Sequence, residues 1–227
     1  MALGKAPSPD GFTSNFFHHF LDLVKEEVVE IVEESRSKRG VLKAFNVTFL
    51  TLIPKEVGAK ILDKFRPISL CNVIYKIISK VISNRLKPLL PNLIFPEQSG
   101  FMEGHQILDG AILVHEVIQS LQSSQQPGMM IKLDIDKAFD KLSWQFIRKM
   151  LEAYVFFQGW VEWVMGLIST PFFSILLNGA PTRIFQPSRG IKQGDPLSPF
   201  LFILMVEGLI CLPQTQAKNG ELRGLRI

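Results

Sequence analysis

Apolar side chains recur three and four positions apart over most of the chain. This spacing places them on one face of a helix, which can then pack against a core. It predicts helices over residues 14–35, 73–86, 106–123, 142–154, 160–169 and 198–212. Pro88 follows the second of these helices, and the cations and glycine at 36–40 are typical of the end of the first.

Shorter apolar runs, rich in β-branched and aromatic residues, predict strands between the helices. These runs span residues 45–53, 65–70, 129–135, 172–177, 182–185 and 222–227. A polar turn joins the first two into a predicted hairpin, and Asn178-Gly179 is typical of the tight turn of a second hairpin. Strands and helices do not alternate strictly along the chain, so the predicted fold class is α+β.

Composition indicates a chain that can bury a core, because 47% of its 227 residues are hydrophobic and 20% are charged. The net charge of +4 is distributed unevenly. Residues 41–90 contain nine Lys and Arg against two Asp and Glu, a net of +7, whereas residues 1–40 and 91–227 are net negative. A concentrated basic segment suits a polyanionic partner such as nucleic acid or nucleotide phosphates, although a solvated Lys-rich face gives the same pattern.

Cysteine usage and the longest apolar run argue against two classes of protein. Cys71 and Cys211 form neither a metal-binding pattern nor a disulfide framework, which makes an intracellular protein the default expectation. The apolar run at 200–206 stops at Glu207, well short of the ~20 residues of a membrane-spanning helix. We therefore expect no membrane partner; the pattern leaves the oligomeric state open.

The segment from Arg189 to Phe200 concentrates two cations, two glycines, two prolines, an amide and a carboxylate. Glycine lets a backbone approach a ligand closely and adopt a positive φ. Ser198 followed by Pro199 is typical of the N-cap and first residue of a helix. By composition alone this is an ordinary loop between a strand and a helix, but the order of its residues points to a more specific role.

Three carboxylates, Asp134, Asp136 and Asp140, lie around the end of the predicted strand at 129–135. Mg²⁺ binds one or two carboxylates and completes its shell with waters and phosphate oxygens, so the end of a buried strand is a suitable place for it. Asp136 and Asp140 are equally consistent with a turn and a helix cap. Asp134 lies within the apolar run, where a carboxylate needs a partner, and it is the stronger candidate.

Taken together, these segments resemble the reverse transcriptases of LINE-type (non-LTR) retrotransposons. The loop R-G-x-x-Q-G-D-P-L-S-P resembles the family's primer- and nucleotide-binding loop, and K-x-D-x-x-K-A-F-D at 132–140 resembles its metal-binding motif. Further matches follow the family's order at residues 5–12, 53–55, 65–70, 75–77, 84–86, 98–101 and 178–179. Within the family, the plant branch looks closest.

The resemblance implies a right-hand polymerase fold, in which residues 1–105 are mostly fingers and residues 106–227 are a partial palm, without a thumb. It also implies RNA-directed DNA synthesis, with an RNA template, a DNA primer and dNTPs as partners. Two Mg²⁺ ions would serve the complete enzyme by two-metal phosphoryl transfer. An active enzyme of this family is expected to gain access to the nucleus.

The resemblance assigns the metal site to two neighbouring residues. Asp134 is the implied catalytic residue and binds both Mg²⁺ ions, with the Ile135 carbonyl assisting one of them. The family's other metal-binding motif contains an Asp-Asp pair, and no such pair occurs in these 227 residues. Two Mg²⁺ ions carry four positive charges and Asp134 offers one negative charge, so we expect weak metal binding and no polymerase activity from this chain alone.

The resemblance assigns nucleotide binding to five further residues. Phe139 would lie under the sugar and exclude a ribose 2′-hydroxyl, although simple core packing also explains an aromatic residue there. Lys55 and Arg66, which belong to the basic segment, would contact the triphosphate. Gln193 and Gly194 would line the nucleotide and template site through side chain and backbone.

Two alternatives to a polymerase stay open. The first is a non-catalytic remnant that binds nucleic acid through residues 41–90. The second is a Mg²⁺-dependent phosphohydrolase, since an apolar strand followed by D-x-D, here Asp134 and Asp136, is also typical of the haloacid-dehalogenase type. That type normally has Thr or Val where this chain has Ala138.

Overall fold

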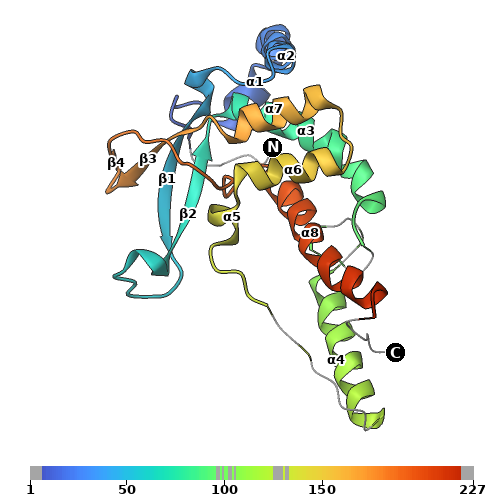
Figure 1. Ribbon diagram of the computed structural model, residues 1–227. Helices are drawn as coiled ribbons and strands as arrows, with labels where there is room; N and C mark the ends of the chain where they lie inside the picture. The colour runs from blue at the N-terminus through green and yellow to red at the C-terminus, as the bar shows by residue number, and fades with distance from the viewer. Residues whose placement is uncertain are drawn as a thin grey trace. The chain divides into compact units, whose positions relative to one another are not determined.

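The structure, a computed structural model, describes residues 7–95, 98, 100–101, 104, 106–124, 130 and 133–220 (Figure 1). The chain divides into two compact units. The first unit combines Met1–Arg85 with Ala138–Ser198, and the second combines Leu86–Lys137 with Pro199–Ile227. All four strands found in the described residues belong to the first unit.

The sheet of the first unit is mixed, with the strand order β2-β1-β3-β4. The strands are β1 (Val47–Pro54), β2 (Phe65–Cys71), β3 (Phe172–Leu177) and β4 (Ala180–Pro181). β1 pairs antiparallel with β2 and parallel with β3, and β3 pairs antiparallel with β4. Asn178 and Gly179 have φ values of 51° and 82°, as the central residues of a type I′ turn require. The α+β class, the first hairpin and the Asn178-Gly179 turn of the second are therefore confirmed, but the second strand of that hairpin is Ala180–Pro181 and not 182–185, where Phe185 forms a single bridge to Phe173.

The helices of the first unit are α1 (Ser14–His19), α2 (Leu21–Ser37), α3 (Val73–Leu86), α5 (Ala138–Lys141), α6 (Trp144–Ala153) and α7 (Gln158–Ile168), with short 3₁₀ turns η1 (Lys43–Asn46) and η2 (Leu62–Lys64). The helices α3, α6 and α7 bury the apolar faces that their spacing predicts, whereas α1 and α2 bury only Ser14 and Ser35, and Leu23 is 75% exposed. α7 packs against both α6 and α2 (Figure 1). Ile78 and Ile82 of α3, Leu151 of α6 and Val164 of α7 are fully buried and form the centre of this core.

The helix predicted over 14–35 is interrupted at Phe20, which ends α1 and begins α2. The Phe16 ring lies 4.6 Å from that of Phe12 and 5.1 Å from that of Phe20, measured between centroids. This aromatic cluster joins the preceding turn to α1, a contact that helical spacing alone does not reveal.

The second unit contains η3 (Lys87–Asn92) and α4 (Ile107–Ser124). It also contains α8 (Ser198–Lys218), apart from Ser198, which belongs to the first unit. α8 extends six residues past its predicted end at 212, through Pro213. The hydroxyl of Thr215 donates to the Cys211 carbonyl at 2.8 Å, which supports the turn around the proline. Glu207 is 2% exposed, and its carboxylate accepts a hydrogen bond from the Phe95 N–H at 3.0 Å.

α8 also bears on the expectation that no membrane is involved. It has 21 residues, and an 18-residue window within it has a mean hydropathy of 1.5, so length and composition would allow it to cross a membrane. Core helices of soluble proteins share these properties but are mostly buried, whereas 28% of this window is buried; Glu207 within it is buried and hydrogen-bonded. The absence of a membrane partner stays a prediction.

The strand predicted over 129–135 is wrong for the residues that the structure describes there, which are 130 and 133–135. They have no regular secondary structure, and Leu133 is 72% exposed. A strand needs a neighbour to bond its N–H and C=O groups, and no strand in the described part of the chain pairs with this segment. The strand predicted over 222–227 lies outside the described residues.

Two helices end in the Schellman arrangement with a non-glycine residue in the left-handed position. At the end of α2, the Gly40 N–H donates to the Ser35 carbonyl at 3.0 Å, and Arg39 has a φ of 54°. At the end of α6, the Phe156 N–H donates to the Leu151 carbonyl at 3.3 Å, and Val155 has a φ of 58°. Glycine is usual there because an L side chain crowds the backbone at positive φ.

Val155→Gly is predicted to raise the free energy of unfolding by about 1 kcal/mol, because it removes a β-branched side chain from a left-handed conformation. Val155 is 88% exposed, so little packing is lost. Urea unfolding followed by circular dichroism measures the change as a shift in midpoint at constant m. The matched control is Val29→Gly, at an exposed position within α2, where glycine is expected to lower stability by roughly 0.4 kcal/mol. A destabilised Val155→Gly would contradict the assignment of strain.

Candidate active site

The glycine-rich loop begins at Gly190, which is fixed against α5 and the residues after it. The Gly190 N–H donates to the Leu142 carbonyl at 2.8 Å, and its carbonyl accepts from the Trp144 indole N–H at 2.8 Å. Gly190 has a φ of 92°, and a Cβ there would lie 2.9 Å from the Asp140 carbonyl oxygen. Only glycine permits both this conformation and this close approach. The loop and α5 are therefore held as one piece.

The middle of the loop covers the edge of the sheet. β2 is an edge strand, and its Ser69 N–H donates to the Gln193 carbonyl at 2.8 Å. Gly194, the next residue, has a φ of 101° and is exposed. The loop thus satisfies a strand edge that would otherwise present free backbone groups, and Gly194 leaves backbone accessible to a ligand.

Lys192 points inward from the loop and is only 5% exposed. Its ammonium donates to the Asn46 side-chain oxygen at 2.6 Å and lies 3.5 Å from the centroid of the Tyr75 ring. Burial lowers the pKa of Lys192, while the nearby Cys71 and Asp195 oppose that effect. A buried ammonium is costly unless it is compensated, and here a polar oxygen and an aromatic face supply the compensation.

Asp195 connects the loop to α3 and to the start of α8. Its carboxylate accepts from the Ser79 hydroxyl at 2.5 Å and from the Ser198 N–H and hydroxyl at 3.2 and 3.1 Å. The Ser79 oxygen in turn accepts from the Leu197 N–H at 3.1 Å. Burial raises the pKa of Asp195, and the Ser79 hydrogen bond and Lys192 work against that rise. The cap predicted at Ser198 is wrong: Asp195 accepts the free N–H at the helix start.

Gln193, the next residue, is half-buried and lies in a turn that continues to Gly194. It lines a pocket of about 500 Å³, together with Asp140, Arg189 and the β2 residues Pro67 and Ser69. The Gln193 amide nitrogen lies 3.4 and 3.5 Å from the two carboxylate oxygens of Asp140, which is long for a hydrogen bond. The Gln193 side chain is therefore oriented by Asp140 but loosely held.

Three of the predicted nucleotide-binding residues occupy other parts of the first unit. Phe139 is half-buried in α5, and its carbonyl accepts from the Ile191 N–H at 3.0 Å. Lys55 follows β1, and its ammonium donates to the Asp63 carbonyl at 3.1 Å. Arg66 is exposed on β2 and does not line the pocket, since strand residues alternate in direction and its neighbour Pro67 does.

The predicted metal ligands, Asp134 and Ile135, belong to the second unit. The expectation of a carboxylate at the end of a buried strand is wrong here: Asp134 is exposed and Ile135 is 48% exposed, because the segment has no strand neighbour. No group of three or more His, Cys, Asp or Glu side chains that could hold a metal ion occurs in the described part of the chain. The residues described do not by themselves fit a Mg²⁺ site.

A family model described as "Reverse transcriptase (RNA-dependent DNA polymerase)" matches residues 53–223. The chain belongs to this family. Its relatives include the transposon TX1 149 kDa protein of Xenopus laevis, 30% identical over 212 residues that cover 93% of this chain and 16% of that protein. The retrovirus-related Pol polyprotein from type-2 retrotransposable element R2DM of Drosophila melanogaster is 30% identical over 210 residues, 92% of this chain and 19% of that protein.

These matches confirm the resemblance to reverse transcriptases of non-LTR retrotransposons. The chain spans less than a fifth of the length of either relative. A mitochondrial protein of Arabidopsis thaliana is 46% identical over 56 residues, 25% of this chain and 46% of that protein. The assignment to a plant branch stays a prediction.

Sequence analysis missed the roles of Lys192, Asp195 and Asp140 within this reverse transcriptase segment. Lys192 and Asp195 look like solvated charges in a turn, and their burial depends on Asn46, Tyr75 and Ser79, which are distant in sequence. One signal was available for Asp195: it precedes Pro196 and stands three residues before a serine that opens an apolar helix.

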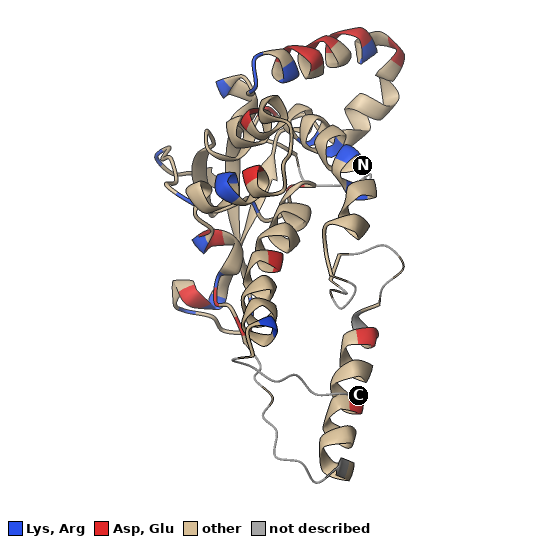
Figure 2. Cartoon of the chain, turned by 45° about the vertical axis from the view of Figure 1, so that its right-hand side comes forward, with Lys and Arg blue, Asp and Glu red and all other residues tan. Residues whose placement is uncertain are grey.

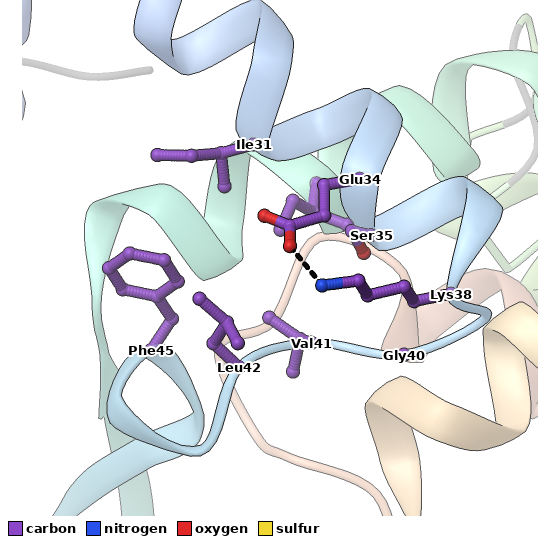
Figure 3. Close-up of a pocket in the computed structure, with 9 residues that line it drawn as sticks. Ile31, Glu34, Ser35, Lys38, Gly40, Val41, Leu42 and Phe45 are labelled. Atoms are coloured by element: carbon purple, nitrogen blue, oxygen red, sulfur yellow. Dashed lines mark hydrogen bonds and ion pairs between the residues drawn. The ribbon is translucent and has the colours of Figure 1, made fainter.

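A smaller pocket of about 200 Å³ lies beside α2 (Figure 3). Apolar side chains from Ile31, Val41, Leu42 and Phe45 line it, and an ion pair between Glu34 and Lys38 crosses one side. An i,i+4 pair on a helix surface adds only a few tenths of a kcal/mol, roughly 0.3–0.5. The pocket contains no group suited to nucleotide chemistry.

Asp195→Asn is predicted to lower the free energy of unfolding by about 1–3 kcal/mol, although the two side chains have the same shape. The carboxylate accepts hydrogen bonds from the Ser79 hydroxyl and from the N–H and hydroxyl of Ser198. The amide nitrogen of Asn is itself a donor, so it could not accept one of these bonds. Urea unfolding measures the loss. Asp10→Asn, in an exposed turn, is the matched control and should change stability by less than about 0.5 kcal/mol. Equal stability of Asp195→Asn and wild type would contradict this assignment.

Proposed function

We propose that this chain is a segment of an RNA-directed DNA polymerase that extends a DNA primer with dNTPs on an RNA template. The proposal rests on one observation: two motifs of the family that are distant in the sequence are joined in the structure. Phe139 and Asp140, at the end of the metal-binding motif, are tied by backbone hydrogen bonds and close contact to Gly190 and Ile191 of the nucleotide-binding loop. The loop is thereby preorganised before a nucleotide arrives.

We propose that residues 1–105 form most of the fingers and residues 106–227 a partial palm. The β1–β2 hairpin supports this division, because it projects Lys55, Lys64 and Arg66 as exposed cations around its turn. A hairpin that carries cations can close on the triphosphate of a nucleotide. No thumb is proposed within the chain.

The proposed nucleotide path runs along the face of the hairpin that bears Arg66. Ile68 lies on the same face, two residues along β2, and its Cγ2 is 3.8 Å from where a Cβ on Gly194 would be. Glycine at 194 therefore leaves the backbone open beside the cations. Gln193 precedes Gly194 in the loop but lines the pocket on the other face of β2, and Phe139 is proposed to lie under the sugar.

For the metal site, we propose that Asp134 and the Ile135 carbonyl supply ligands for Mg²⁺ when the remaining carboxylates are present. Mg²⁺ would polarise the phosphoryl oxygens and neutralise developing charge. The exposure of Asp134 leaves its oxygens accessible to an ion. A single carboxylate is a weak Mg²⁺ site, so the other ligands must come from beyond the residues described.

The two alternatives differ in what supports them. A phosphohydrolase would need Asp134 and Asp136 at the end of a strand, and the described residues near them form none. A non-catalytic remnant that binds nucleic acid is consistent with the net charge of +7 at residues 41–90. It differs from the polymerase only in that it catalyses no reaction. Measurements of nucleotide binding and of primer extension distinguish the polymerase from these two alternatives.

Arg66→Gln is predicted to weaken binding of a fluorescent dATP analogue by about tenfold, because a charge-assisted hydrogen bond to phosphate contributes at least about 1.5 kcal/mol. Fluorescence anisotropy in the presence of Mg²⁺ measures the affinity. Lys25→Gln, an equal loss of charge at an exposed position of α2, is the control and should leave affinity within twofold, about the limit of an exposed charge. Equal affinities for Arg66→Gln and wild type would remove Arg66 from the nucleotide site.

The chain alone is predicted to give no measurable primer extension on an RNA template with dNTPs and Mg²⁺, because its metal-binding carboxylates are too few. Gel analysis of a labelled DNA primer tests this directly. Robust extension that Asp134→Ala abolishes would overturn the prediction of inactivity and support the polymerase assignment. Dephosphorylation of a small phosphate ester that depends on Asp136 and not on Gln193 would instead support the phosphohydrolase.

A further inference from the structure

A second basic pocket, of about 350 Å³, lies on the first unit and shares no residue with the pocket beside Gln193. It forms where the ends of α2 and α3 meet the start of α7. Its lining is Arg36, Ser37, Arg39, Arg85, Phe157, Gly159, Trp160 and Trp163. Three guanidinium groups and three aromatic rings in one pocket are an unusual combination for a purely structural surface.

The cations of this pocket are available to a ligand. α2 carries six acidic residues and two basic ones, and the cations Arg36, Lys38 and Arg39 gather at its end (Figure 2). Arg36 is paired with Glu33 at 2.6 Å, but Arg39 and Arg85 are exposed and form no ion pair with any residue that the structure describes. The Glu162 carboxylate pairs with both guanidinium nitrogens of Arg148, and this hydrogen bonding lowers the pKa of Glu162; the charge of Arg39 lowers it further but forms no ion pair with it.

One aromatic ring of the pocket is exposed to solvent, and the other two are packed against the protein. Phe157, at the N-terminus of α7, is 79% exposed. Trp160 is half-buried and stacks on Phe156, with the ring centroids 4.6 Å apart and an interplanar angle of 29°. Trp163 is buried beneath them, and its indole N–H donates to the Ser35 hydroxyl at 2.8 Å. The Phe157 ring lies against Gly159, where a Cβ would be 2.6 Å from a ring carbon, and the rest of the ring is exposed for stacking.

The backbone of Arg39 is fixed in place against α7. A Cβ on Gly166 of α7 would lie 2.2 Å from the Arg39 carbonyl oxygen, so glycine at 166 is what allows the turn to approach the helix. Arg39 itself holds a left-handed φ of 54° where glycine would be unstrained. Val155 holds the same conformation at the end of α6, so this strain belongs to a helix end and is not by itself a sign of function.

We propose that this pocket binds a single-stranded segment of RNA, with phosphates on Arg39 and Arg85 and a base stacked on Phe157. Guanidinium groups match phosphate oxygens, and an exposed ring binds the face of any base. A duplex hides its base faces, so an unpaired strand fits this combination better. The site is separate from the proposed nucleotide site and needs no polymerase activity in order to bind.

The test is fluorescence anisotropy of the 227-residue protein with a fluorescein-labelled single-stranded uridine decamer, over a range of salt concentrations. The double variant Arg39→Gln/Arg85→Gln is expected to weaken binding at least tenfold and to reduce the slope of log K against log salt by about 1.4, for two lost phosphate contacts on a single strand. Phe157→Ala should weaken binding by roughly tenfold with little change in the salt slope.

The controls separate this site from the fold and from the nucleotide site. Lys25→Gln/Lys149→Gln removes two exposed charges from α2 and α6 outside the pocket, and should change affinity by less than threefold. Arg39→Gly places glycine in the left-handed position, so it should fold at least as stably as wild type and still bind RNA more weakly. Gln193→Ala affects the proposed nucleotide and template site, so the Arg39, Arg85 and Phe157 substitutions should cause the same fold-losses of RNA affinity in a Gln193→Ala background.

Three results would overturn the proposal. The first is equal affinity for the double arginine variant and the lysine control. The second is full RNA affinity in both the Arg39→Gly variant and the Phe157→Ala variant. The third is double-stranded RNA of the same length that binds as tightly and with the same sensitivity to Phe157→Ala. Failure of dATP binding or primer extension affects the polymerase assignment and leaves this pocket standing.

Discussion

The buried ammonium of Lys192 is the interaction on which the geometry of the active-site loop depends. It is almost fully removed from water, and burial on that scale is unfavourable unless the charge finds partners. Asn46 supplies a hydrogen bond and Tyr75 an aromatic face. Lys192 is thereby anchored, and the next residue, Gln193, lines the pocket beside Asp140.

The same interaction connects elements that are far apart in the chain. The Asn46 amide that accepts from Lys192 also donates to the Leu167 carbonyl and to the Thr170 hydroxyl, at 3.2 and 2.9 Å. Asn46 thus joins the entry to β1, the end of α7 and the loop. Asp195 makes the corresponding connection to α3 through Ser79. Both charges are satisfied within the first unit, so the loop is built before any substrate binds.

Much of the fold could be predicted because local spacing determined it. α3 follows its apolar stripe residue for residue, and the Asn178-Gly179 turn fixes the second hairpin. The sequence motifs also led to the family. The break at Phe20 and the continuation of α8 through Pro213 could not be predicted, because they depend on ring contacts and a single hydroxyl bond that periodicity does not encode.

The loop residues of the site could be predicted, but the residues that hold them in place could not. Gln193 and Gly194 were identified from the order of residues in the loop, yet the reason they hold their positions lies in Asn46, Tyr75 and Ser79. Such partners are separated from the loop by over a hundred residues and carry no local signal. The apolar run around Asp134 was misread as a strand for a related reason: a strand is defined by its neighbour, and spacing within one segment cannot supply one.

The central claim is that the loop is rigid and preorganised. Native-state amide hydrogen exchange of Ser69, Gly190 and Ile191 tests it most directly, because these N–H groups donate to or belong to the loop. The account predicts that all three exchange only with global unfolding, as slowly as the buried Ile78 of α3. Exchange as fast as that of the exposed turn at Val57 and Gly58 would contradict it.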